Sequence, residues 1–268
     1  MPAVSDTKDV GRERFVVLAS LLSLVALAWL YLWIGATSMD SMSMGAGVME
    51  IVSKPSAMAV PAYGVKPLLL TFLMWAVMMI GMMLPSAAPA ILFYSSMVRK
   101  SREGGSALSS AWIFTAGYLA VWSVFSLAAT VLQATLETQR LLIAPTMSSA
   151  NAWLSGSLFI AAGIYQWLPA KDACLEKCRS PLQLFLFGWR PGPVGAFRMG
   201  AEHGFFCVGC CWALMLLLFA AGVMNLLWVA LIAVFVFIEK LAPAGRLIGR
   251  IAGVGLAAAG AHVILANA

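Results

Sequence analysis

The chain has 268 residues, of which 62% are hydrophobic and 10% are charged, and its mean hydropathy is +0.92. Soluble domains carry about 25% charged residues, so this composition cannot cover a water-facing surface and indicates an integral membrane protein. The formal net charge of +6 does not indicate nucleic-acid binding, because the basic residues lie in short stretches between apolar runs and form no basic helix face.

Seven apolar runs approach the roughly 20 residues that a membrane-spanning helix requires. They are Phe15–Ile34, Pro67–Leu84, Leu108–Ala129, Ala152–Leu168, Met199–Ala220, Val223–Ile238 and Leu247–Leu265. The second run is expected to continue past Pro85 and Pro89 to Val98 as a kinked helix, because proline removes one hydrogen bond within a helix. The sequence therefore predicts an all-α fold, a single polytopic bundle over residues 1–268 with about seven transmembrane helices.

The distribution of basic residues predicts the orientation of this bundle. If the N-terminus is cytoplasmic, all 17 Lys and Arg residues except Lys54, Lys66 and Arg140 lie on the cytoplasmic side. This predicts a cytoplasmic lead at 1–14, an outer loop at 35–66, an inner loop at 169–198 and a C-terminus outside. The first apolar run is longer than a signal-peptide core, so we expect a retained anchor and a multi-pass protein of the bacterial inner (cytoplasmic) membrane.

Methionines recur in the outer loop and in the second apolar run. The outer loop contains Met39, Met42, Met44 and Met49, and thioethers bind Cu(I) where thiols are prone to oxidation. An amphipathic stretch lying on the membrane is the alternative for this loop. In the second run, the methionines share a helix face at four-residue spacing or lie beside it, and they are candidate metal ligands: Met74, Met78, Met82 and Met83. Methionine also fills gaps in cores, which is the competing interpretation.

The five cysteines are an odd number and lie in the second half of the chain, which does not indicate an extracellular disulfide framework. Cys174 and Cys178 share a face if the inner loop is helical there, and nearby basic residues favour their thiolates. The fifth run carries four further candidate ligands that share one helix face: His203, Cys207, Cys210 and Cys211. Imidazole and thiolates suit Cu(I) or Zn(II), whereas buried free cysteines otherwise act as small core residues.

The fifth run and the second run are expected to face each other, because their sulfur-bearing segments overlap in depth in the cytoplasmic half of the bilayer. Two further features lie towards the C-terminus. Lys240 is expected to reach the inner interface, and Glu239 is a candidate partner of Arg246 or His203. Small residues recur every four positions over 245–261, which indicates close helix packing and offers a face for a larger complex.

The combination of these stretches resembles a bacterial family of predicted metal-binding integral membrane proteins. The matching stretches are Met74-Trp75 through Met82-Met83-Leu84-Pro85-Ser86, Cys174-Leu175 with Cys178-Arg179-Ser180-Pro181, His203-Gly204 with Cys207, Gly209-Cys210-Cys211-Trp212-Ala213-Leu214-Met215, Gly222, Met224-Asn225 and Glu239-Lys240. The resemblance covers the chain from the second run to the seventh. It implies a polytopic membrane protein that binds a metal.

The favoured function is therefore binding or movement of a soft transition metal, with Cu(I) first and Zn(II) as the alternative ion. The ten candidate ligands are Met74, Met78, Met82, Met83, Cys174, Cys178, His203, Cys207, Cys210 and Cys211. The competing functions are a membrane thiol-redox or assembly factor and a structural subunit of a larger membrane complex. Expected partners are the lipid bilayer and a membrane or metallochaperone protein, without nucleic acid. The sequence contains no recognisable catalytic constellation, so we expect no enzyme.

Overall fold

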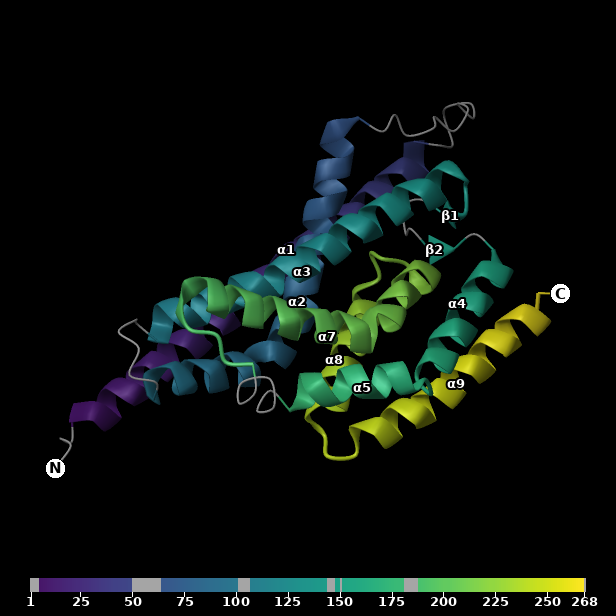
Figure 1. The fold of residues 1–268 in the computed structure, drawn as a ribbon. Helices are drawn as coiled ribbons and strands as arrows, with labels where there is room; N and C mark the ends of the chain where they lie inside the picture. The colour runs from purple at the N-terminus through teal and green to yellow at the C-terminus, as the bar shows by residue number, and fades with distance from the viewer. Residues whose placement is uncertain are drawn as a thin grey trace.

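The computed structural model describes residues 5–49, 64–100, 107–143, 148–149, 151–180 and 188–267. Over these ranges the chain is all-α apart from one short antiparallel strand pair, in which β1 (Leu142–Ile143) pairs with β2 (Ser148–Ser149). The helices are α1 (Ser5–Met49), α2 (Val65–Lys100), α3 (Ala107–Thr138), α4 (Ala152–Tyr165), α5 (Pro169–Arg179), α7 (Gly192–Ala221), α8 (Leu226–Leu241) and α9 (Gly245–Leu265). Figure 1 shows α4 and α9 side by side at one end of the molecule.

Five of the described helices contain a segment that is long and apolar enough to cross a membrane. These segments are Gly11–Thr37, Val65–Arg99, Ala107–Thr138, Gly192–Ala221 and Gly245–Leu265. The other two predicted spans form α4 and α8, which have 14 and 16 residues and are shorter than a bilayer core of about 30 Å requires for a straight helix. The seven-span count and the orientation therefore stay predictions.

The first helix is longer than the sequence predicted. The expected outer loop begins at residue 35, whereas α1 continues as a helix to Met49, so the first part of this connecting segment is helical. The Thr37 hydroxyl donates to the Trp33 carbonyl at 3.0 Å, and the methionines that follow favour a helix. The side chains of Met39, Met42, Met44 and Met49 and the remainder of the loop up to residue 63 lie outside the described residues.

The second helix runs through both of its prolines, as predicted. Because Pro85 has no N–H, the carbonyl of Gly81 loses its partner one turn earlier, and it accepts a hydrogen bond from Trp29 Nε1 of α1 at 3.3 Å instead. Figure 1 shows that α2 changes direction along its length, which is the expected effect of proline within a helix. The bend brings Met83 and Ser86 beside the helices that carry the cysteines.

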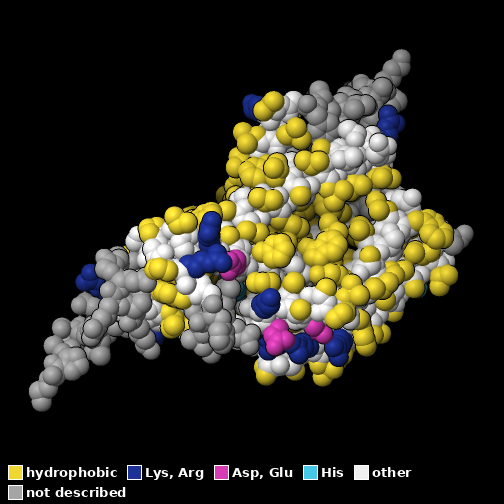
Figure 2. Space-filling model, viewed as in Figure 1, with side chains coloured by type: hydrophobic (Ala, Val, Ile, Leu, Met, Phe, Trp, Pro, Cys, Tyr) yellow, Lys and Arg dark blue, Asp and Glu magenta, His cyan; other side chains and the backbone are white. Residues whose placement is uncertain are grey.

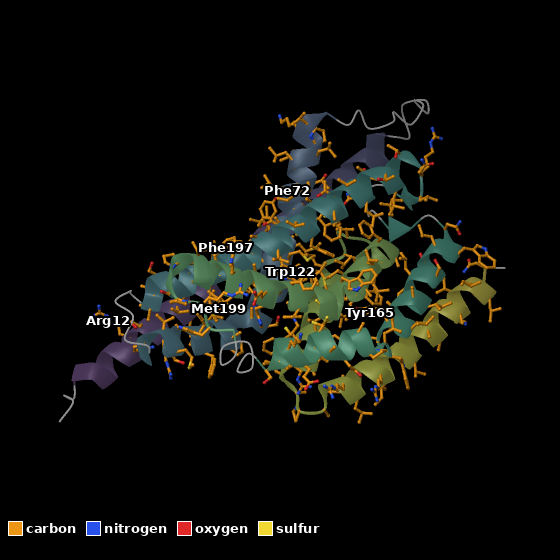
Figure 3. The ribbon with its side chains drawn as sticks, viewed as in Figure 1. Arg12, Phe72, Trp122, Tyr165, Phe197 and Met199 are labelled. Carbon is orange, nitrogen blue, oxygen red and sulfur yellow. The ribbon has the colours of Figure 1, made fainter. Side chains whose placement is uncertain are left out.

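Glycines set the distance between the helices that pack most closely. A Cβ on Gly117 of α3 would lie 2.0 Å from the Phe197 carbonyl oxygen, and a Cβ on Gly200 of α7 would lie 1.9 Å from the Phe114 carbonyl oxygen. The α3 and α7 backbones therefore touch on both sides of this crossing. In Figure 3 Met199 and Trp122 point into the interior near the crossing, and both are buried.

The small residues of α9 pack within the chain. A Cβ on Gly253 would lie 2.8 Å from the Gly163 carbonyl oxygen, and one on Gly260 would lie 2.5 Å from the Gly156 carbonyl oxygen. The packing interpretation of residues 245–261 is therefore confirmed at Gly253 and Gly260, while Ala261 at the end of this stretch is exposed. A contact of this stretch with a second chain stays a prediction. The opposite face, with Leu247 exposed, stays uncovered.

The surface of the molecule fits a lipid environment. The face shown in Figure 2 is mostly hydrophobic, and its few charged side chains gather in small groups, one of them along the lower margin. Large apolar side chains are exposed along the candidate spans, including Phe15, Leu69, Val124, Phe205 and Ile251. Because water disfavours such a surface, the five candidate spans and this exterior together indicate contact with a bilayer.

Candidate metal site

The four candidate methionines of α2 are all buried, and one of them contacts a cysteine. Met74, Met78 and Met82 lie in the core, as does Met83, which is fully buried. Among the described residues, Met83 is the methionine whose Sδ contacts a thiol, with 3.9 Å between it and Cys211 Sγ. The expected meeting of the two sulfur-bearing segments is thus seen at the cytoplasmic end predicted for α2, next to Pro85.

The three cysteines of α7 turn inward and are buried, as is His203 one turn before them. The thiols of Cys210 and Cys211 both donate to the Cys207 carbonyl, at 3.1 Å and 3.0 Å. In these two hydrogen bonds the thiol protons of Cys210 and Cys211 point to the α7 backbone. The Cys207 sulfur is left to interact with other side chains.

The inner cysteines lie on a helix, which confirms that their spacing gives them a common side. This helix, α5, begins at Pro169, where the missing N–H costs no helical bond. Cys178 is buried, and its thiol lies within hydrogen-bonding reach of the Cys207 and Cys210 thiols. Cys174 is half-buried and lies against Gly209, where a Cβ would come within 2.8 Å of its Sγ.

Both α5 thiols are held in their protonated form. Hydrogen bonds with the Cys207 and Cys210 sulfurs, and then burial, raise the pKa of Cys178 well above its ordinary value. Burial is the main cause that raises the pKa of Cys174, and the adjacent Lys177 opposes it. A metal ion that binds to Cys178 must therefore displace its proton.

The Cys207 sulfur is the centre of a small polar cluster. Lys240 Nζ lies 2.9 Å from Cys207 Sγ and 3.1 Å from Ser86 Oγ. The Tyr118 hydroxyl lies 3.0 Å from the same sulfur and 3.2 Å from the Met83 carbonyl oxygen, to which it donates. Because an ammonium group only donates, the Cys207 sulfur accepts from Lys240, and the adjacent positive charge favours its thiolate.

His203 does not join this cluster through a hydrogen bond in the described part of the chain. Its Nδ1 is buried without a partner, and its ring packs against Phe114 and Tyr118 with centroid distances of 6.1 Å and 5.8 Å. A buried nitrogen without a partner carries a desolvation cost. His203 therefore has a nitrogen that is free to bind, one helical turn from Cys207.

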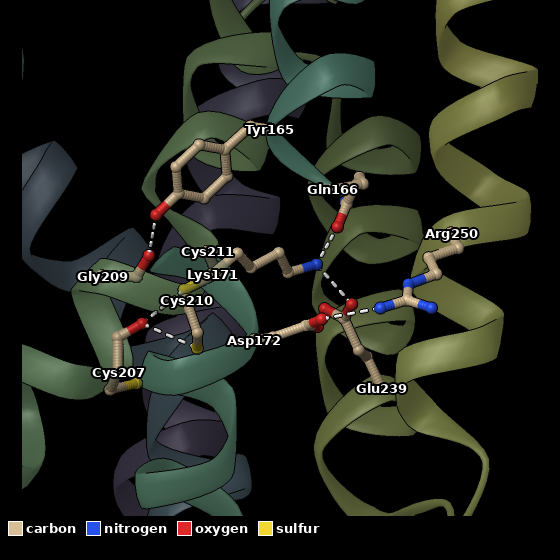
Figure 4. A network of polar contacts seen from close by, with 10 residues as sticks. All are labelled: Tyr165, Gln166, Lys171, Asp172, Cys207, Gly209, Cys210, Cys211, Glu239 and Arg250. Atoms are coloured by element: carbon tan, nitrogen blue, oxygen red, sulfur yellow. Dashed lines mark hydrogen bonds and ion pairs between the residues drawn. The ribbon is translucent and has the colours of Figure 1, made fainter. Parts of the chain in front are cut away.

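A polar network fastens α5 to α8 and α9 next to the sulfur cluster. Lys171 donates to Gln166 and to Glu239, and Arg250 pairs with Asp172 at 2.9 Å, as Figure 4 shows. Arg246 pairs with Glu176 at 2.6 Å further along α5. Gly249 allows this approach, because a Cβ there would lie 2.3 Å from a Glu239 oxygen. The network fixes the position of α5, the helix that carries Cys178, relative to α8 and α9.

Two sequence predictions about charged residues were wrong. Lys240 does not reach the interface, because it is only 5% exposed and bonds to Cys207 and Ser86. Glu239 pairs with Lys171, which the sequence analysis did not single out, and not with Arg246 or His203. The sequence feature that points to both buried contacts is the Glu239-Lys240 pair at the end of an apolar run. A charged side chain within such a run is costly unless it has a partner.

The donors that meet here are thiols and a thioether, and this donor set suits Cu(I) rather than a hard ion such as Mg²⁺. Over the ranges that the structure covers, no group of three or more His, Cys, Asp or Glu side chains is arranged to hold a metal ion. The soft donors come from three helices, with Cys178 on α5, Cys207 and Cys210 on α7, and Met83 on α2.

Comparison with curated proteins and with solved structures gives no significant match. A sequence profile of the family described as "PpoB2: Copper chaperone" matches residues 72–263. The matched range begins before Met74 and continues beyond Glu239 and Lys240, so it includes all ten candidate ligands and the polar cluster around Cys207. The chain therefore belongs to the PpoB2 copper chaperone family.

Proposed function

We propose that the chain is a membrane-embedded chaperone that holds one Cu(I) ion between Cys178 of α5 and Cys207 of α7. The observation that carries this proposal is the convergence of buried sulfur from three helices: Cys178 of α5 lies within reach of Cys207 and Cys210 of α7, and Met83 of α2 lies against Cys211. Thiolate and thioether ligands select Cu(I), and Zn(II) is the alternative ion for the same thiolates. Membership of a copper chaperone family supports the same choice of metal.

Cys207 and Cys178 have different parts in this proposal. Cys207 receives a hydrogen bond from an ammonium group and presents a thiolate. Cys178 keeps its proton in the metal-free chain, so binding of Cu(I) forms a bond to each sulfur and releases the Cys178 proton. Cys210, Cys211 and Met83 lie beside this pair as further sulfur donors, and His203 lies one turn away.

The remaining candidate ligands suggest how copper reaches and leaves the pair. Met74, Met78 and Met82 line one face of α2 and lead towards Met83 through the core. Half-buried Cys174 lies beside Gly209, at the edge of the cluster, where an acceptor protein has access to its sulfur. We infer that thioethers receive the ion and that Cys174 passes it to a protein partner.

We also propose the orientation that the basic residues predict, with the N-terminus and α5 on the cytoplasmic side. Basic residues then surround the cytoplasmic end of the sulfur cluster, namely Lys171, Lys177, Arg179, Arg246 and Arg250. In this arrangement α4 and α8 complete a seven-span bundle despite their length, and the protein lies in the bacterial inner membrane. It acts by holding and transferring copper and not as an enzyme.

Metal content tests the proposal directly. The full chain, purified in a lipid-like environment under anaerobic, reducing conditions and given Cu(I), is expected to retain about one copper per chain by elemental analysis. The Cys207→Ala/Cys210→Ala variant is expected to retain less than about a tenth of that amount, because it loses the thiolate and its neighbour. Val208→Ala, a change on the same turn of α7, serves as the control and should retain the full amount.

Two results would contradict the proposal. One is a wild-type chain that retains no copper, and the other is a double variant that retains as much copper as the control. A wild-type chain without copper that instead forms a disulfide between Cys178 and Cys207 would point to a thiol-redox function. Circular dichroism of each variant shows whether the helices remain folded.

A further inference from the structure

Lys240 is a buried cation that forms no ion pair with a carboxylate within the described ranges. The ion pairs there join Arg99 to Glu13, Lys171 to Glu239, Arg190 to Glu202, Arg246 to Glu176 and Arg250 to Asp172. The neighbouring carboxylate, Glu239, is thus already paired with another buried lysine. The atoms that accept from Lys240 Nζ are Cys207 Sγ and Ser86 Oγ.

This arrangement has an electrostatic consequence. A buried ammonium group costs several kcal/mol unless a charge of opposite sign accompanies it. A serine hydroxyl is neutral, so the Cys207 thiolate is the partner that balances Lys240. When a metal ion binds, the charges of the ion, the thiolates and Lys240 must together be close to zero, because the cluster lies among apolar helices.

We propose that Lys240 determines the charge of the ion that the site accepts, and so favours monovalent Cu(I) over divalent Zn(II). This inference rests on the proposed function, because it takes Cys178 and Cys207 as the two thiolate ligands. Two thiolates, one ammonium group and one Cu(I) ion are neutral together. The same groups with Zn(II) carry one uncompensated positive charge in a region of low dielectric constant.

The position of Lys240 makes it a specificity residue and not a ligand. Its ammonium group has no lone pair to offer a metal, and it lies on α8, outside the two helices that supply the thiolates. The 3.1 Å bond to Ser86 directs the ammonium group to the side of α2, so that it can stay beside the Cys207 sulfur while copper binds to that sulfur. Lys240 therefore affects metal binding through its charge, which acts over a short distance.

Replacing Lys240 by methionine removes the charge and keeps most of the side-chain volume. We expect Lys240→Met to weaken Cu(I) affinity at least about tenfold and to weaken Zn(II) affinity by less or strengthen it, so that the preference for Cu(I) falls. Competition with chromophoric chelators for Cu(I) and for Zn(II) measures both affinities on the purified full chain. Lys240→Arg retains the charge and is expected to keep the ratio of the two affinities within about threefold of wild type.

The control is Arg99→Met/Glu13→Gln, which removes an ion pair between α2 and α1 and leaves the residues around Cys207 unchanged. It should keep the wild-type ratio, whereas a general structural effect would lower both affinities in all variants alike. If Lys240→Met keeps the wild-type ratio, the inference is wrong even though copper binds through Cys207. If wild type binds no Cu(I), or Cys207→Ser binds it as tightly as wild type, the proposed function itself fails.

Discussion

The Lys171→Met variant is expected to lose about 3–5 kcal/mol of unfolding free energy, because it leaves Glu239 charged, buried and without its partner. The side chains of this ion pair are each only 2% exposed, so water cannot replace the lost partner. The measurement is the thermal or denaturant-induced unfolding of the purified chain, followed by circular dichroism or by tryptophan fluorescence.

A second variant tests whether the loss of stability comes from the unpaired charge or from the changed shape of the side chain. In Lys171→Met/Glu239→Gln both charges are absent, and we expect most of the lost stability to return, because removing both ions of a buried pair is often close to neutral. A single Lys171→Met variant as stable as wild type would show that the pair does not hold α5 and α8 together. Since the pair anchors α5, the single variant should also be more sensitive to proteolysis near Cys178.

The Cys178→Ser variant is expected to lose at least about 100-fold in Cu(I) affinity, because it removes one of the two proposed ligands. Loss of a residue that only supports a ligand costs roughly 10–100-fold, so loss of the ligand itself should exceed that range. A serine hydroxyl is a hard donor and does not replace a thiolate for Cu(I). Chelator competition under reducing conditions gives the affinity.

Cys174→Ser provides the comparison on the same helix. Its sulfur lies against Gly209 and is proposed to pass copper on, so we expect an affinity loss at least about tenfold smaller than for Cys178→Ser. Slower transfer of copper to an acceptor is the expected effect of this change. Equal losses in the two variants would contradict the proposed pair, because they would indicate that both α5 thiols bind the ion equally.

Composition and apolar run length were sufficient to predict an all-α membrane protein and the helix through Pro85 and Pro89. They were not sufficient for the first loop, where α1 continues to Met49, because alanine, methionine and serine can remain helical beyond the bilayer. Composition and run length also did not predict that α4 ends at Tyr165 and that a new helix begins at Pro169. Helix ends depend on local hydrogen bonds that hydropathy does not record.

The candidate site was predictable in part. Helical spacing alone placed Cys207, Cys210 and Cys211 on one side of α7, and they are buried there. Spacing within one helix says nothing of which other helices lie opposite, so the contact of Cys178 with α7 required the fold. The same holds for Lys240, whose long side chain can reach either the interface or a buried sulfur. The packing of α8 against α7 and α2, which carry the two acceptors of Lys240, decides between these two positions.

X-ray absorption at the copper edge, on the full chain loaded with Cu(I) in lipid, tests most directly whether sulfur from α5 and α7 holds one ion. We expect a Cu(I) edge and a first shell of two sulfur atoms, and we expect the Cys178→Ser chain to lose one of them. A first shell of nitrogen or oxygen in the wild-type chain, or a sulfur shell that does not change in Cys178→Ser, would contradict the account.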